Sequence, residues 1–428
     1  MNLDAIHASL IDSRTKGIPA HTPPFRLDAI GEKGWNVLAE DMNLPLAVLK
    51  QSGIAHNSAW MRDFIARSGA VIAPHGKTTM APQLFQMQLD DGAWAITIAN
   101  PHQMQVARAH GVNRIIMANQ VIGTQGVHYV LTELRDCPEL DFYCIVDSEA
   151  ALGQLECGLA AIDPGRPLQL FLEGGMLGGR TGVRDIETGL RVARRIKANP
   201  RLALRGVEGF EGLVSGPREA REAQVRGFLD LLVGLAKACE AEDLFAPGEV
   251  ILTAGGSAYY DMVLARFRHA GLSRPTKIIT RSGCYLSHDA ISYRRFFSEI
   301  TDRTPDTPAG GLVSAIEVWG YVQSRPEPDR VLCTLGARDI SGGDPPLPQT
   351  WYRPGGGMNA PVALPAGHHA TGMNDQHCYV VVPVDSPLAV GDMVSFGVSH
   401  PCLTFDKWQV IPVVDDAYNI VGAVRTFF

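Results

Sequence analysis

Short apolar runs alternate with segments of helical pattern between about residue 70 and residue 281. The eight runs are AVIAP (70–74), AITIA (95–99), RIIMA (114–118), DFYCIV (141–146), LQLFLE (168–173), LRGVEGF (204–210), EVILTA (249–254) and KIITR (277–281). Helical period or helix-forming composition marks most segments between them, such as 101–110, 148–160, 185–198 and 217–241. Apolar strands joined by helical crossovers predict a parallel sheet buried on both faces. Eight such units favour a closed (β/α)8 barrel in an α/β protein, with a doubly wound open sheet as the alternative.

One further strand and one further helix precede this region. LPLAVLK (44–50) has the composition of a strand. Asn57 or Ser58 can cap the helix that follows, and Gly69 can end it. The first 40 residues are irregular and contain a Pro-Pro turn, which indicates a linker.

After residue 290 the pattern changes from helical to β-like. The short β-like runs are 314–322, 331–335, 378–384, 392–399, 408–414 and 420–428. Gly/Pro-rich stretches lie between them, notably 341–348 and 353–359. This pattern predicts a mostly antiparallel β domain. We therefore expect an N-terminal extension and linker over 1–43, a cofactor-binding barrel with its leading strand over 44–290, and a C-terminal β domain over 291–428.

Composition and charge narrow the classes of protein that this chain can be. Hydrophobic residues make up 46% and charged residues 19%, which excludes a mainly disordered chain. The net charge is −7 and no basic block is present, so we expect no nucleic-acid partner. No apolar run approaches the ~18–20 residues that cross a bilayer, and the first residues do not resemble a signal peptide. We therefore expect a cytoplasmic protein without a membrane partner. The eight cysteines form no CxxC pair, so we expect free thiols with one or two metal ligands among them.

Lys77 is the first candidate for chemistry, because active-site residues of a barrel lie at the carboxyl ends of its strands. It follows the first strand in PHGKTT (74–79), and none of the other seven lysines falls at such a position. A lysine among apolar strand ends can lose solvation and become a nucleophilic amine. The alternative is an ordinary solvated lysine in a loop.

Glycine-rich turns follow the seventh and eighth strands, where barrels commonly bind phosphate. They are TAGGS (253–257) and RSGCY (281–285), and the first contains Gly255-Gly256. Adjacent glycines let backbone N–H groups approach an anion, although a tight turn would explain them equally well. A rim lysine together with a phosphate site indicates pyridoxal 5'-phosphate (PLP), whose aldehyde reacts with lysine. Arg180 in a glycine-rich loop would face the same rim, unless it is a surface arginine.

His400-Pro401-Cys402 is a candidate metal site in the β domain. Residues two apart in an extended segment point to the same side, and imidazole and thiolate are the usual zinc ligands. Two protein ligands leave positions open for a substrate, as a catalytic metal requires. Chance is the alternative for so short a motif. His377-Cys378 and His368-His369 are weaker candidates of the same kind.

These motifs together resemble one family. PHGKTTMAP (74–82), RTGV (180–183), TAGGSAYYD (253–261), RSGCY (281–285) and HPC (400–402) occur in this order. In this respect the chain resembles the D-serine dehydratase / D-threonine aldolase family of alanine-racemase-like, fold-type III PLP enzymes. The resemblance covers roughly residues 40–428, and it implies an N-terminal barrel, a C-terminal β domain and a homodimer with its active site near the subunit interface. Phe210 departs from the family, because many relatives have a tyrosine there near the cofactor.

The resemblance also implies a set of site residues. Lys77 would form the Schiff base with PLP, and His400 and Cys402 would bind Zn2+. The other residues expected around the cofactor are His75, Arg180, Gly255, Gly256, Ser257, Ser282, Gly283, Cys284 and Tyr285. Aldolase-like members carry His-x-Asp at the metal pair and dehydratase-like members carry His-x-Cys, so the cysteine favours dehydration.

The resulting hypothesis is a PLP- and zinc-dependent lyase, similar to D-serine ammonia-lyase, that converts a β-hydroxy D-amino acid to a 2-oxo acid and ammonia. The main alternative is a metal-dependent D-threonine aldolase that yields glycine and an aldehyde. A PLP racemase and a non-catalytic PLP carrier are further alternatives, and a metal-only barrel hydrolase would leave Lys77 unexplained.

Overall fold

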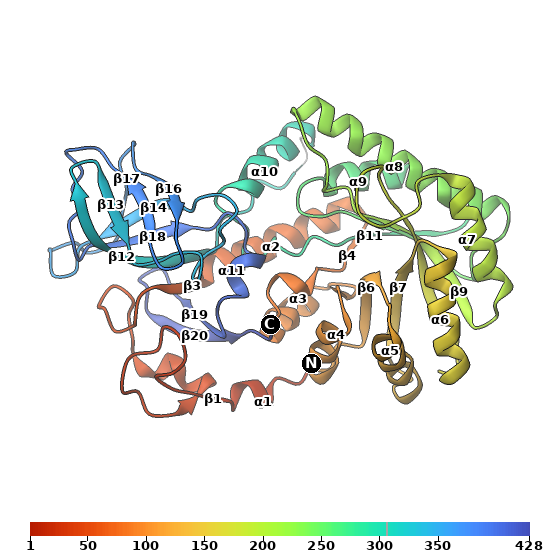
Figure 1. The fold of residues 1–428 in the computed structure, drawn as a ribbon, viewed down its shortest axis with the longest axis horizontal. Helices are drawn as coiled ribbons and strands as arrows, with labels where there is room; N and C mark the ends of the chain where they lie inside the picture. The colour runs from red at the N-terminus through yellow and green to blue at the C-terminus, as the bar shows by residue number, and fades with distance from the viewer. Residues whose placement is uncertain (305–306) are drawn as a thin grey trace.

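The computed structural model describes residues 1–304 and 307–428, and its first large sheet is a parallel eight-stranded barrel (Figure 1). Its strands are β4 (Val71–Ile72), β5 (Ile96–Ile98), β6 (Arg114–Gln120), β7 (Asp141–Val146), β8 (Leu168–Gly174), β9 (Leu202–Gly209), β10 (Val250–Ala254) and β11 (Thr276–Thr280). They neighbour one another in the order β4-β11-β10-β9-β8-β7-β6-β5. A parallel bridge between His75 and Thr97 joins the two ends of this order. The sheet is therefore closed, which confirms the predicted barrel and excludes the open sheet.

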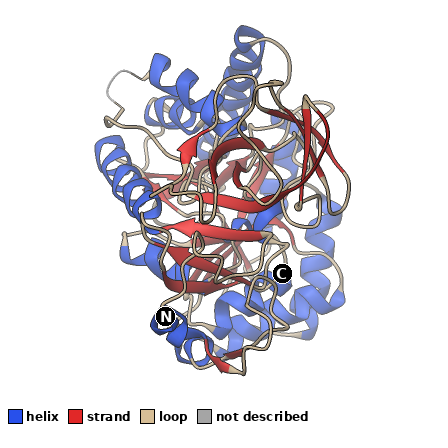
Figure 2. Cartoon of the chain, turned by 90° about the vertical axis from the view of Figure 1, so that its left-hand side faces the viewer, coloured by secondary structure: helices blue, strands red, loops and turns tan. Residues whose placement is uncertain are grey.

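Helices cover the outside of the barrel strands (Figure 2). They are α3 (Pro82–Asp90), α4 (Pro101–Ala109), α5 (Thr124–Asp136), α6 (Glu149–Ala161), α7 (Ile186–Ala198), α8 (Arg218–Ala241) and α9 (Tyr260–Arg268). Side chains of Asn100, Ser148 and Asp185 accept hydrogen bonds at the N-termini of α4, α6 and α7, which satisfies backbone N–H groups that lack a partner within the helix. In the described part of the chain, no helix is long and apolar enough to cross a membrane.

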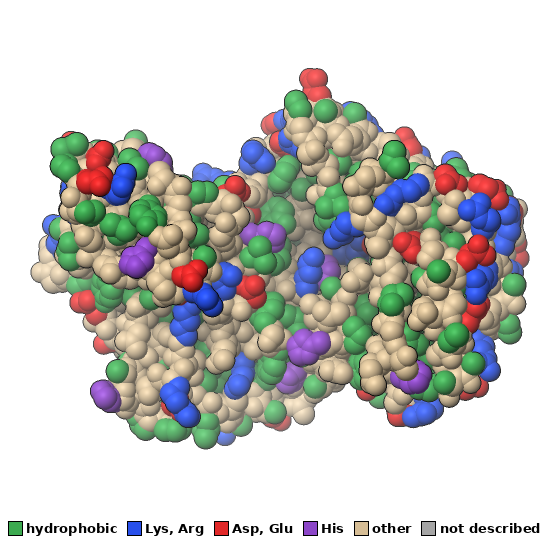
Figure 3. All heavy atoms as spheres, viewed as in Figure 1, with side chains coloured by type: hydrophobic (Ala, Val, Ile, Leu, Met, Phe, Trp, Pro, Cys, Tyr) green, Lys and Arg blue, Asp and Glu red, His purple; other side chains and the backbone are tan. Residues whose placement is uncertain are grey.

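The second large sheet has ten strands and is mostly antiparallel. Its strands are β3 (Leu46–Lys50), β12 (Ile316–Glu327), β13 (Arg330–Cys333), β14 (Leu347–Tyr352), β15 (Val362–Ala363), β16 (His369–Met373), β17 (Cys378–Val381), β18 (Met393–Gly397), β19 (Val410–Val414) and β20 (Ile420–Arg425). This sheet forms the lobe opposite the barrel in Figure 1, and Figure 3 shows a hollow between the two lobes. The predicted antiparallel β domain is therefore confirmed.

Three details differ from the sequence-based expectation. The leading strand β3 pairs with β12 and β19, so it lies in the C-terminal sheet rather than with the barrel. Helix α2 (Gln51–Ser68) begins six residues before Asn57, whose side-chain amide instead donates to the backbone oxygens of Leu286 and Val313 at 2.9 and 2.7 Å. Helix α10 (Ser292–Arg303) and strand β14 lie where we expected only β-like runs and a Gly/Pro-rich stretch. The exact domain bounds stay a prediction.

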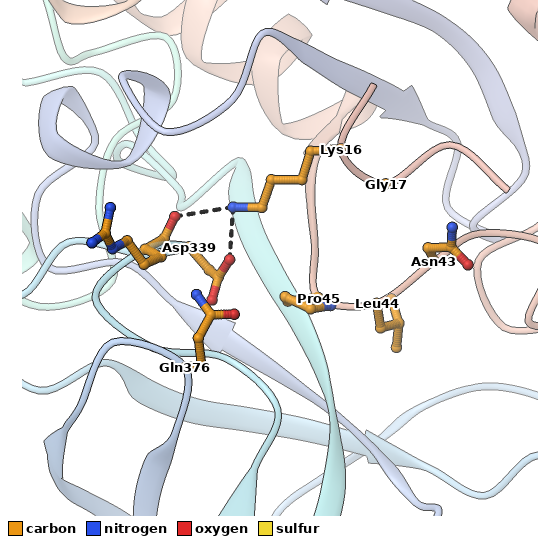
Figure 4. Close-up of a pocket in the computed structure, with 8 residues that line it drawn as sticks. Lys16, Gly17, Asn43, Leu44, Pro45, Asp339 and Gln376 are labelled. Carbon is orange, nitrogen blue, oxygen red and sulfur yellow. Dashed lines mark hydrogen bonds and ion pairs between the residues drawn. The ribbon is translucent and has the colours of Figure 1, made fainter. Parts of the chain in front are cut away.

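The N-terminal segment packs on the C-terminal sheet. It contains α1 (Asp4–His7), β1 (Leu10–Ile11), β2 (Phe25–Arg26) and the 3-10 helix η1 (Leu27–Lys33). Lys16 forms an ion pair of 2.6 Å with Asp339, whose side chain is 1% exposed, and its ammonium lies 3.8 Å from the centre of the Trp408 ring. Figure 4 shows this pair beside a cavity of about 520 Å³ that Gln376 also lines. Because Lys16 neutralises a buried carboxylate, this contact ties the segment to the β domain.

We expect Lys16→Met to lower the free energy of unfolding by about 1–3 kcal/mol. Removal of one partner of a fully buried pair costs about 3–5 kcal/mol, and the 35% exposure of the Lys16 side chain reduces the cost here. Urea denaturation measures the change. Lys33→Met is the matched control, because Lys33 packs on the Phe25 ring and has no carboxylate partner among the described residues. Equal losses in the two variants would contradict the prediction.

Candidate active site

Lys77 lies at the mouth of the barrel, in the 3-10 helix η2 (Gly76–Thr78) that follows β4. Its side chain is exposed rather than desolvated as we expected, and it has no hydrogen-bond or ion-pair partner within the described residues. Burial lowers the pKa of His75 well below its usual range, and the charges of Lys77 and Arg281 lower it further. A hydrogen bond with Cys402 raises the pKa of His400, and the charge of Lys77 opposes this rise. Lys77 therefore lies within electrostatic reach of both the barrel and the β domain.

The metal candidate and the turn after the eighth strand meet at this mouth. Cys402 begins the short helix α11 (Cys402–Phe405), and its Sγ lies 3.5 Å from Cys284 Sγ. The Thr78 hydroxyl lies 3.4 Å from Cys402 Sγ and 3.6 Å from Cys284 Sγ. Hydrogen bonds from Cys284 and His400 lower the pKa of the Cys402 thiol well below its usual range. The fold thus gathers residues from η2, the RSGCY turn and the HPC motif, and Thr78 is a member that the sequence analysis missed.

The weaker metal candidates do not join this group. His368 contacts the Ser386 hydroxyl at 2.7 Å and the Pro365 oxygen at 2.9 Å, which is a structural role. Cys378 is fully buried in β17 opposite Cys333. No group of three or more His, Cys, Asp or Glu residues in the described ranges is arranged to hold a metal ion. The pair of His400 and Cys402 therefore stays a two-ligand candidate.

The N–H groups of the glycine-rich turns fall into two sets, one paired within the chain and one not. The N–H groups of Gly255 and Gly256, which we expected to bind phosphate, donate to the buried Glu211 carboxylate at 3.0 and 2.7 Å. In contrast, no hydrogen bond in the described part of the chain uses the N–H groups of Ser257, Gly283 and Cys284, of which Gly283 and Cys284 are buried residues and Ser257 is half-buried. Buried N–H groups are almost always paired. These three unpaired donors therefore fit an anionic group that is not part of the polypeptide.

The other predicted cofactor residues take different positions. The Ser282 hydroxyl donates to the Gly256 oxygen at 2.8 Å and so links the two turns. Tyr285 is 4% exposed and packs in the hydrophobic core. Arg180 is exposed, and its guanidinium lies 4.5 Å from the centre of the Phe210 ring. The Phe210 ring is therefore engaged by the Arg180 guanidinium.

A set of buried carboxylates at the strand ends was not predicted. Glu208 at the end of β9 pairs with Arg281, which also donates to Thr253 Oγ1 at 2.8 Å. Glu173 at the end of β8 accepts a hydrogen bond of 2.8 Å from Thr181 and another from Gln120. The signal was available, because GVEGFEG (206–212) places two acids where a barrel strand ends.

Three of the candidate residues, Gly256, Ser257 and His400, line one cavity, whereas Lys77 and Cys402 are not part of its wall. The volume of this cavity is about 180 Å³. Aromatic rings of Phe210 and Tyr293 also line it. The cavity can therefore hold a small polar molecule with one apolar side, next to the metal candidate.

The raised pKa of the Glu173 side chain should be visible in the pH dependence of the protein's stability. Burial, with a contribution from the charge of Glu208, raises the pKa of Glu173 to about 8 from a usual value of 4.5. Between these values the folded chain binds a proton that the unfolded chain does not, so stability decreases as pH rises. We expect Glu173→Gln to match the wild type near pH 5 and to exceed its unfolding free energy at pH 8. Urea denaturation across this range tests it. Glu219→Gln, at an exposed position, should show no such trend.

Comparisons with known proteins agree with the resemblance. Residues 315–414 match the family model described as "Putative serine dehydratase domain". The chain is 23% identical over 376 residues to the D-threonine aldolase of an Arthrobacter species. The aligned region covers 88% of this chain and 90% of that protein. Its fold is similar to that of D-threonine aldolase from Filomicrobium marinum, with a TM-score of 0.74, 18% identity and coverage of 92% and 97%.

A second solved relative is a dehydratase. D-threo-3-hydroxyaspartate dehydratase from Delftia sp. HT23 matches with a TM-score of 0.70 and 18% identity, over 92% of this chain and 99% of that chain. A mutant of such a dehydratase, with a cysteine replaced by alanine, is described as metal-free. The resemblance to the D-serine dehydratase / D-threonine aldolase group is confirmed by these matches.

Proposed function

We propose that this chain is a PLP- and zinc-dependent lyase that converts a β-hydroxy D-amino acid, D-serine first among them, to a 2-oxo acid and ammonia. The observation that carries the proposal is the meeting of Lys77, three N–H groups without an acceptor in the described chain and the His400–Cys402 pair at one barrel mouth. The similarity to a D-threonine aldolase and to a D-threo-3-hydroxyaspartate dehydratase supports the same class of substrate.

The residues present fit PLP. Lys77 offers an amine without a competing partner in the described chain, and it would hold the cofactor aldehyde. The N–H groups of Ser257, Gly283 and Cys284 would hold the phosphate. When bound, PLP supplies an electron sink for the charge left at Cα. The Lys77 amine would also accept the Cα proton. A catalytic base must lie within hydrogen-bond reach of the proton that it removes, and the lysine that holds the cofactor would meet this condition.

The residues of the HPC motif fit a zinc ion. His400 and Cys402 are imidazole and thiol ligands, and Thr78 and Cys284 keep the Cys402 sulfur in place. Zinc supplies Lewis acidity that offsets the negative charge on a departing hydroxyl. The description of one form of the related dehydratase as metal-free supports a metal site in proteins of this kind.

The second candidate function is retro-aldol cleavage, which the similarity to D-threonine aldolases favours. The purified protein, supplied with PLP and zinc, is incubated with D-serine, D-threonine and D-threo-3-hydroxyaspartate, and the products are identified. A keto acid with ammonia supports the lyase that we propose. Formation of glycine with an aldehyde overturns the lyase proposal in favour of the aldolase. Interconversion of enantiomers indicates a racemase. Absence of PLP binding excludes a PLP-dependent enzyme of any of these kinds.

The phosphate donors are tested by Gly283→Ala. A Cβ at Gly283 would lie 2.4 Å from the His75 backbone oxygen, so the turn must shift and its N–H groups lose their alignment. We expect PLP retention after dialysis to fall at least about tenfold, since loss of hydrogen bonds to a charged group costs about 1.5–3 kcal/mol. Gly343→Ala is the matched control, because nothing lies within 4 Å of its added Cβ. Unchanged PLP retention would count against these donors.

A further inference from the structure

Two thiols that are 118 residues apart in the sequence meet beside the candidate metal site. Cys284 Sγ and Cys402 Sγ are separated by 3.5 Å, and the Thr78 hydroxyl lies against both sulfurs. Cys284 belongs to the turn after β11, and Cys402 begins the four-residue helix α11. The family resemblance gives a metal-binding role to the Cys402 side chain, whereas the proposed function gives the Cys284 thiol only a supporting contact with Cys402.

The exposure of the two thiols differs in a way that matters for their reactivity. Cys402 is partly exposed, and Cys284, which is in contact with it, is 5% exposed. Cys333 and Cys378 also face each other, across β13 and β17, but both are fully buried. Only a thiol that solvent reaches can be oxidised first, and a second thiol in contact can then resolve the product. Among these two pairs, the one formed by Cys284 and Cys402 meets both conditions.

We propose that Cys284 and Cys402 form a reversible disulfide when a hydroperoxide oxidises the protein. The Cys402 sulfur attacks one peroxide oxygen, the O–O bond breaks, and a sulfenic acid and one molecule of water or alcohol form. The Cys284 sulfur then attacks the Cys402 sulfur, and the sulfenic oxygen leaves as water. The two thiols lose two protons and two electrons in total, and the peroxide accepts them.

The geometry permits this step with a small movement. A disulfide bond is about 2.05 Å long, so the sulfurs must approach by roughly 1.5 Å. The helix α11 is one turn long and ends at Phe405, so only a short element has to move. A disulfide would remove Cys402 as a metal ligand but leave Lys77 untouched. This consequence for the metal rests on the proposed function, whereas the disulfide rests on the contact between the thiols.

The test uses the full-length protein with PLP and without added metal. Hydrogen peroxide is added to a Cys157→Ser variant, which lacks the exposed cysteine of helix α6, and peptides are mapped by mass spectrometry. We expect loss of two thiols, a peptide pair cross-linked between 284 and 402, and recovery with dithiothreitol. With Cys284→Ser added, the cross-link should vanish and Cys402 should be trapped as a sulfenic acid by dimedone. Oxidation of Cys402 to the sulfinic acid with Cys284 still reduced, or no cross-link at all, overturns the proposal.

A second arm separates this inference from the proposed function. The same variant is loaded with zinc before the peroxide is added, and the rate of cross-linking is compared. We expect zinc to slow cross-linking at least about tenfold, because a metal-bound thiolate is no longer available to the peroxide. If the cross-link forms equally fast with and without zinc, the metal assignment fails while the disulfide stands. If the cross-link does not form in the zinc-free protein, the disulfide proposal is wrong, regardless of the result with zinc.

Discussion

Lys77→Ala should remove all covalently bound PLP and lower turnover of D-serine by at least about 10³-fold. The expected loss is large because one amine would serve both as the attachment point and as the base, and a positioned base alone contributes about 10²–10⁴-fold. Lys77 is the lysine at the barrel mouth, and its side chain has no other partner in the described chain. Its removal should leave the fold intact, because the side chain is exposed.

The measurement has two parts. Visible absorption reports the lysine-bound cofactor, and borohydride reduction followed by peptide mapping identifies the lysine. Lys197→Ala is the matched control, because Lys197 lies in α7 and pairs with Asp243. That variant should keep both the absorbance and the activity. A reduced adduct on a lysine other than Lys77 would contradict the assignment, and so would activity retained by the alanine variant.

The barrel could be predicted from the sequence because a strand that is buried on both faces appears as a short continuous run of apolar residues. All five residues of β10 are buried, for example, and appear as a continuous apolar run in EVILTA (249–254). Strand β14 was missed because Leu347–Tyr352 follows a run of prolines and has a mixed, half-exposed pattern. Strand β3 was recognised as a strand but was assigned to the barrel, whereas it pairs with β12 of the C-terminal sheet. A run of apolar residues indicates that a strand is buried, but it does not indicate which strand it pairs with.

The candidate site was predictable only where its chemistry lies in a short motif. Lys77 and Cys402 stand in such motifs, whereas the contact of Thr78 with Cys284 and Cys402 joins segments that are far apart in the chain. Glu211 shows the same limit, because nothing local indicates that its carboxylate accepts the N–H groups of the Gly-Gly turn. The donors left for an anion could therefore be identified only after the fold had shown which glycines were already paired.

Removal of the metal should strongly slow ammonia release from D-serine but leave the lysine-bound cofactor in place. Hydroxide is a poor leaving group, and a Lewis acid beside it is worth several kcal/mol, which corresponds to about 10²–10³-fold in rate. His400 and Cys402 lie in the β-domain part of the site, whereas Lys77 and the unpaired N–H donors belong to the barrel. EDTA treatment and Cys402→Ala should therefore lower the rate by this factor while the visible absorbance of bound PLP persists.

Cys402→Asp is the sharper form of this test. A carboxylate is a harder ligand than a thiolate and favours ions such as Mn2+, so the metal content should change from zinc toward manganese. We expect the product balance to move from pyruvate and ammonia toward glycine and an aldehyde, if the ligand next to His400 helps to set the reaction. Cys157→Ala, at an exposed cysteine of helix α6, should change neither metal content nor products. Full ammonia release by protein shown to be metal-free would remove zinc from the mechanism and leave only a structural role for His400 and Cys402.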